Sequence, residues 1–249
     1  MVLRILGNMP VSQILDIIRV AAALSVLAYA SISDLKTRRV NNYAWVALAA
    51  VGVIALFVQI AFREADWFYL MFTPLLVIVI YFLYRFRLIY GGADAKALIA
   101  LAITFPFWPS VPLGAFPLWR SFFPFAYVIL ANSVLMLSLL PLLFLAYNLV
   151  NLRGKVEFPH CLLGFKIPTA TARGRFLWPL EKLDDGKRRY VSSLRTKLGL
   201  DETAVEFAAA GIERIWVTPK IPFIVVLNIG LIVSLFCGDI ISKIISLLV

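Results

Sequence analysis

The sequence contains little charge, one histidine and two cysteines among its 249 residues. Only 15% of the residues are charged, a composition that excludes an ordinary soluble globular domain. The lone His160 has no partner in its own segment for a Ser-His or Cys-His arrangement, so we interpret it as structural or exposed and not as catalytic. Cys161 and Cys237 lack the spacing of a zinc site. We therefore expect no metal and no other cofactor.

Apolar residues are abundant instead, at 62% of the chain with a mean hydropathy of +0.91. A bilayer core about 30 Å thick is crossed by roughly 20 apolar residues of helix. The sequence predicts an all-α polytopic membrane protein with about six transmembrane helices. The expected spans are 14–33, 43–62, 67–84, 91–108, 122–150 and 221–248.

The composition changes sharply after residue 150, where most of the remaining charge gathers. We expect a membrane domain with five transmembrane helices over 1–150, a small cytoplasmic soluble domain over 151–219, and the sixth transmembrane helix in 220–249. Within the soluble part, Asp201 and Gly211 predict the start and stop of a short helix over about 202–210.

The basic residues predict the orientation, because Lys and Arg near span ends are retained in the cytoplasm. With both termini outside, most of the 24 Lys and Arg fall in cytoplasmic segments. The net charge of +10 is then expected to face anionic lipid headgroups, and no aromatic-interleaved basic motif indicates nucleic acid. The stretch 28–30, Ala-Tyr-Ala, also resembles a signal-peptidase site. Cleavage there would leave residues 34–39 outside, against the charge distribution, so we favour an uncleaved first span.

Four acidic residues lie in or beside the expected spans: Asp16, Asp34, Asp94 and Asp239. Acids in membrane spans are rare and are functional candidates by default. Asp16 and Asp34 are about 27 Å apart along the first helix. A similar rise places Asp239 near the outer face. Only Asp34 and Asp94 are expected at the same, cytoplasmic depth.

Two carboxylates at one depth on different helices are suited to aspartyl hydrolysis, in which one stays protonated while the other acts as general base. Gly91 and Gly92 would allow a sharp turn and a close backbone approach beside Asp94. The alternative is that Asp94 merely caps its helix.

Two motifs in the sequence resemble those of a known protease family. GGADAK at 91–96 is similar to the Gly-x-Gly-Asp motif of intramembrane aspartyl proteases. DLKTRRVNN at 34–42 resembles the first-aspartate motif of type IV prepilin peptidases. With the six spans and the late hydrophilic insert, the chain is similar to the archaeal branch, the preflagellin peptidases. Ala93 replaces the motif's second glycine, and Asn41 replaces a common proline.

The resemblance implies a multi-pass enzyme of the cell membrane that removes short basic leaders from preflagellin (archaellin) or type IV pilin-like precursors near the cytoplasmic face. It implies Asp34 and Asp94 as the catalytic residues. The residues expected to contact or admit the substrate are Gly91, Gly92, Ala93, Lys96, Arg38 and Asn42. Arg38 and Lys96 are also interpretable as topology anchors. The expected partners are precursor proteins and membrane lipids.

Two other classes stay open on the sequence. A proton- or cation-coupled transporter also uses paired membrane acids, although these usually lie near the midplane in broken helices. A non-catalytic membrane scaffold with the same fold is the second.

Overall fold

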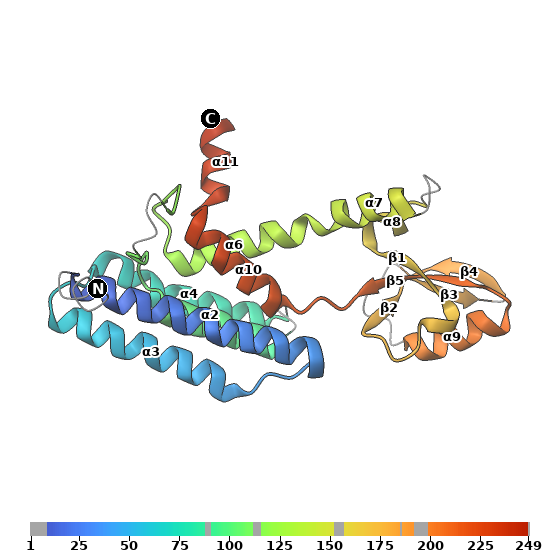
Figure 1. The fold of residues 1–249 in the computed structure, drawn as a ribbon, viewed down its shortest axis with the longest axis horizontal. Helices are drawn as coiled ribbons and strands as arrows, with labels where there is room; N and C mark the ends of the chain where they lie inside the picture. Colours follow the sequence, from blue (N-terminus) through green and yellow to red (C-terminus); the bar gives the residue numbers. More distant parts are fainter. Residues whose placement is uncertain are drawn as a thin grey trace, which may run out of the picture. The chain divides into compact units, whose positions relative to one another are not determined.

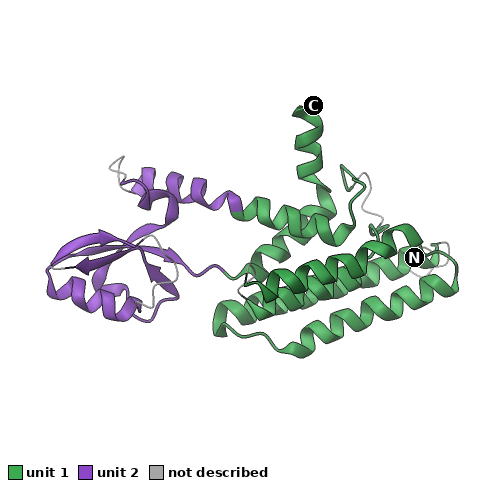
Figure 2. Ribbon diagram, turned by 180° about the vertical axis from the view of Figure 1, so that it is seen from behind, with its two compact units in different colours: residues 1–137, 222–249 green, residues 138–221 purple. Residues whose placement is uncertain are grey.

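A computed structural model describes residues 9–87, 91–111, 116–151, 157–184, 186–191 and 199–248. The chain divides into two compact units (Figure 2): unit 1 holds residues 1–137 with 222–249, and unit 2 holds 138–221. Four helices are long and apolar enough to cross a membrane: Val11–Thr37, Asn42–Ala61, Trp67–Arg85 and Phe125–Asn151. Phe223–Phe236 is a shorter apolar helix. The chain is thus mostly helical, as predicted.

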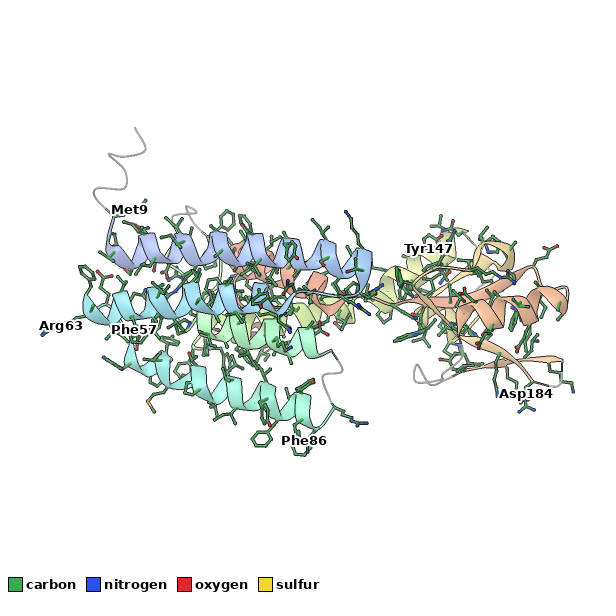
Figure 3. The ribbon with its side chains drawn as sticks, turned by 90° about the horizontal axis from the view of Figure 1, so that it is seen from below. Met9, Phe57, Arg63, Phe86, Tyr147 and Asp184 are labelled. Carbon is green, nitrogen blue, oxygen red and sulfur yellow. The ribbon has the colours of Figure 1, made fainter. Side chains whose placement is uncertain are left out.

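Unit 1 is built around helices that alternate in direction: α2 (Val11–Thr37), α3 (Asn42–Ala61), α4 (Trp67–Arg85) and α5 (Gly92–Thr104). Short connections force consecutive helices to run antiparallel. Figure 3 shows the result, with Met9 and Arg63 at one end of the helices and Phe86 at the other. The end of α2 and the start of α5 therefore lie at the Phe86 end.

The α5 helix is the buried centre of this bundle. It packs against α2, α3, α4 and α10 (Phe223–Phe236), and Ala97, Leu98 and Leu101 are almost fully buried. It ends at Thr104, earlier than the predicted span 91–108, because a residue before proline such as Phe105 is disfavoured in helical conformation. A Cβ at Gly52 would lie 2.5 Å from the Thr104 Cα, so α3 and α5 approach closely there.

The predicted fifth span is interrupted. It consists of α6 (Phe125–Ser138) and α7 (Leu140–Asn151), with a turn at Leu139. Pro141 explains the break, since proline lacks an N–H and its ring clashes with the carbonyl four residues earlier.

The predicted sixth span is also two helices, α10 and α11 (Ile240–Leu248). Gly238 between them has a φ of 79°, a conformation that favours glycine. Its neighbours pair with a distant loop: Trp119 N donates to Cys237 O at 3.2 Å, and Asp239 N donates to Trp119 O at 3.0 Å. In Figure 1, α11 turns away from α10 at this point.

Unit 2 is a mixed α/β module, so the all-α class is wrong for this part of the chain. Strand β5 (Arg214–Pro219) lies between β1 (Phe165–Pro168) and β2 (Leu177–Pro179), antiparallel to both. The strands β3 (Glu181–Asp184) and β4 (Lys187–Tyr190) form a hairpin. The remaining elements are α8 (His160–Leu163), the 3-10 turn η1 (Thr169–Thr171) and α9 (Leu200–Ala209).

This module has its own apolar core, in which Phe207 of α9 packs with Ile215 and Val217 of β5. The predicted short helix over 202–210 is confirmed as α9. The strands escaped prediction because each is only 3 to 6 residues long, and the prolines and glycines in or near them read as loop signals.

Candidate active site

Asp34 lies in the last turn of α2, half-buried. The helix ends at Arg38, whose φ is 56° and whose N–H donates to the Asp34 carbonyl at 3.0 Å. The turn is secured by the Ser33 hydroxyl, which donates to the Arg39 carbonyl at 2.7 Å. Asn41 then caps α3 by accepting from Tyr43 N at 3.0 Å. Asparagine therefore has a structural use at a position where the motif often has proline.

Asp94 lies in the first turn of α5, also half-buried. Gly91 is the N-cap residue, and its φ of −88° is open to any amino acid. The expectation that Gly91 supplies a special turn is therefore wrong. What this position requires is space, because an added Cβ would overlap the Asp94 carboxylate.

Asp34 and Asp94 thus lie on different helices at the same end of unit 1, as predicted. The charge of Asp34 interacts with the Asp94 carboxyl group. Neither carboxylate accepts a hydrogen bond from the residues that the structure describes. The interpretation of Asp94 as a simple helix cap has no hydrogen bond to support it within that part of the chain.

The Asp16 carboxylate has a different environment, a buried ion pair. Arg19 Nη1 donates to Asp16 Oδ1 at 3.1 Å, and the two side chains are 1% and 6% exposed. The same nitrogen donates to Gln59 Oε1 at 2.9 Å, and Ser110 N donates to Asp16 Oδ2 at 2.9 Å. Asp16 therefore joins α2 to the segment after α5. Arg19, which falls within the expected first span, lies inside the bundle.

The Asp239 carboxylate, at the start of α11, also has hydrogen-bond partners. It accepts from Ser242 N at 3.0 Å and from the Ser242 hydroxyl at 2.6 Å. This is the geometry of a helix N-cap. Of the four acids singled out from the sequence, Asp16 and Asp239 hold structural hydrogen bonds, whereas Asp34 and Asp94 accept none from the described residues.

Two family models match this chain. Residues 21–148 match the type IV leader peptidase family, and residues 157–240 match the archaeal peptidase A24 C-terminus, type II. The chain belongs to the type IV leader peptidase family. It is therefore an aspartic peptidase, and the interpretation as a transporter is wrong.

Curated relatives of this leader peptidase cover nearly its whole length at low identity. The preflagellin peptidase of Methanococcus voltae is 27% identical over 92% of this chain and 97% of its own. That of Methanocaldococcus jannaschii is 28% identical over 86% of this chain and 91% of its own. A third, from Methanococcus maripaludis, is 26% identical over 86% of this chain and 92% of its own.

The other predicted site residues of the peptidase have distinct positions. Lys96 Nζ donates to Asn42 Oδ1 at 2.8 Å, which joins the two motifs across α5 and α3. Gly92 faces the Tyr84 hydroxyl, 3.5 Å from a Cβ built there, so this position has ordinary room. Ala93 packs on the apolar core. Arg38 follows the last residue of α2 and has a left-handed backbone conformation.

Sequence reasoning missed Trp45, a buried member of α3 that is 4% exposed. Its indole N–H has no hydrogen-bond partner in the part of the chain that the structure describes. Nothing in the sequence marks it, since it reads as one more apolar residue of a span.

In unit 2, His160 stacks on Trp216, with centroids 5.5 Å apart, and meets Tyr190 edge-on at 4.7 Å. Burial lowers the pKa of His160 below its ordinary 6.5, and the charges of Glu181 and Glu157 offset only part of this. For Glu157 burial alone would raise the pKa, but hydrogen bonds from Lys166 and from the Trp216 indole outweigh burial and lower it. These contacts favour the structural interpretation of His160.

Proposed function

We propose that Asp34 and Asp94 are the catalytic pair of this leader peptidase, and that it removes the basic leader of preflagellin or type IV pilin-like precursors. The observation that carries the assignment is the division of the four acids. Asp16 is held by Arg19, and Asp239 caps α11, whereas Asp34 and Asp94 share one end of the bundle with no hydrogen-bond partner among the described residues.

The chemistry follows from two neighbouring carboxyl groups that share one proton. The ionised member accepts a proton from a water molecule as the water oxygen adds to the scissile carbonyl carbon. The protonated member donates a hydrogen bond to the carbonyl oxygen as negative charge develops there. The C–N bond then breaks, and the leaving nitrogen takes the proton held by the pair. Such a pair titrates as a unit with two macroscopic constants.

The substrate class rests on the relatives and on the membrane arrangement. The curated relatives in three archaeal species are preflagellin peptidases. A precursor whose apolar helix stands in the bilayer presents its leader junction at the membrane surface. With about six transmembrane segments and both termini outside, Asp34 and Asp94 meet that junction at the cytoplasmic face of the cell membrane.

Cleavage of precursors by the purified protein tests this function. The wild-type protein is expected to convert archaellin or type IV pilin precursors to mature protein plus leader, measured by mass spectrometry. Retention of every precursor by folded protein would contradict the substrate assignment and favour a scaffold that keeps the family fold.

A further inference from the structure

A groove lies between α3 and α5, and its first α5 residue, Lys96, follows Asp94 by two positions. It has a volume of about 370 Å³ and is lined by Asn42, Trp45, Val46 and Ala49 of α3 with Lys96, Ile99 and Ala100 of α5. Lys96 follows Asp94 by two residues, or about 3 Å of helical rise, and Ala49 lies roughly 10 Å beyond Asn42 along α3. The groove therefore starts at the level of the candidate catalytic pair and runs along the helices away from that end.

The two ends of the groove differ in chemistry. Lys96 and Asn42 form a polar mouth through their 2.8 Å hydrogen bond. Beyond it the walls are apolar except for Trp45, whose buried indole N–H lacks a partner among the described residues. A buried donor without an acceptor costs free energy, so an occupant that supplies a carbonyl oxygen would be favoured over a lipid chain, which has none to offer there.

We infer that this groove binds the apolar segment that follows the cleavage point of the precursor, and that Lys96 sets the direction of the peptide. The inference rests on the proposed function. The Lys96 ammonium repels a Lys- and Arg-rich leader, so the leader extends away from the mouth of the groove. The uncharged side of the junction then enters between α3 and α5, where a backbone carbonyl accepts from Trp45.

Photocrosslinking tests the position of the peptide. p-Benzoylphenylalanine is placed at Val46, which lines the groove and is 63% exposed, or at Ala47, which is exposed on the opposite face of α3. The background is the inactive Asp34→Asn protein in lipid vesicles. The probe is a synthetic precursor with a Lys/Arg-rich leader and an apolar helix of about 20 residues.

Adducts from position 46 are expected on the apolar segment of the probe, with few from position 47. Adducts from position 46 on the leader would overturn the proposed direction. Equal labelling from both positions, lipid adducts alone or no adduct would show that the groove holds no peptide. Wild-type protein must cleave the same probe, so absence of cleavage identifies a failure of the proposed function instead.

Kinetics provide a second, independent measurement in the active protein. Ala49→Leu narrows the groove and is expected to raise KM for the probe by roughly tenfold with little change in kcat, since pocket contacts of one or two methylene groups have such effects. Ala47→Leu adds the same volume on the other face and should change neither constant. With Lys96→Glu, crosslinks from position 46 should extend to the leader. Equal kinetics for both leucine variants, or an unchanged crosslinking pattern in Lys96→Glu, would contradict the inference.

Discussion

Arg19 donates from Nη1 to the Asp16 carboxylate 3.1 Å away, one helical turn along α2, with both side chains buried. The pair also bonds to Gln59 on α3 and to Ser110 after α5. This network fixes the end of the bundle opposite Asp34 and Asp94. It gives Asp16 a structural role and makes it unsuitable as a neutral control for catalysis.

Asp34→Asn or Asp94→Asn is expected to lower kcat by at least about 100-fold, because an amide cannot exchange a proton as acid or base. The double variant should be scarcely worse than either single one, since the two groups act as a unit. Cleavage of precursor by purified protein measures both. Asp239→Asn is the matched control, because asparagine caps a helix as well as aspartate does. Substantial turnover by folded Asp94→Asn protein would refute the assignment. A metal chelator should change nothing, since no step requires a metal.

Gly91→Ala is expected to reduce activity strongly, because the new Cβ would occupy the place of the Asp94 carboxylate. Gly92→Ala should retain most activity, since its Cβ would meet the Tyr84 hydroxyl at an ordinary 3.5 Å. The kcat of each variant, compared at equal thermal stability, decides the point. The same loss in both variants would indicate a requirement for backbone freedom and not for space.

Breaking the buried ion pair should destabilise unit 1. Asp16→Asn leaves the Arg19 charge buried without its partner, at a cost of about 3–5 kcal/mol. Asp16→Asn combined with Arg19→Met removes both charges and should recover much of this loss. Thermal unfolding in detergent measures the effect. An unfolding temperature for Asp16→Asn equal to that of wild type would show that water satisfies Arg19.

Cysteine labelling tests the orientation, starting from protein with Cys161 and Cys237 replaced. An impermeant reagent added outside should label position 64 and miss positions 39 and 187, all exposed in the structure. Position 39 is preferable to 38 because residue 39 is exposed and residue 38 only partly so. Position 115, also expected outside, lies beyond the described residues. Labelling of 187 from outside would invert the topology and place cleavage on the other face.

The lone His160 should titrate below its ordinary pKa of 6.5, because the neutral ring is favoured when buried against Trp216. An NMR titration of the single histidine measures this directly. Both lowered pKa values make unit 2 less stable as the pH falls, because burial disfavours the charged His160 ring and protonation of Glu157 weakens the hydrogen bonds that it accepts. A titration at or above 6.5 in the folded protein would contradict the burial.

Local patterns in the sequence determined much of this protein. Apolar runs determined the membrane helices α2, α3 and α4, since each run closely matches one helix. The shared depth of Asp34 and Asp94 followed from helical rise and the order of spans, and the motifs around them led to the family that the comparisons show. These features depend on residues near one another in the chain, which sequence spacing describes well.

Tertiary structure alone decided which partner each polar group has. Arg19 meets Asp16 and Gln59, and the Asp16 carboxylate accepts from Ser110, which lies 94 residues beyond it. Lys96 meets Asn42 across 54 residues, and Trp119 pairs with the chain at Gly238. Depth along a helix is a one-dimensional property that composition and spacing encode. The rotation and close approach of helices, on which the buried ion pair, the space at Gly91 and the groove beside Trp45 depend, are set by packing between distant segments.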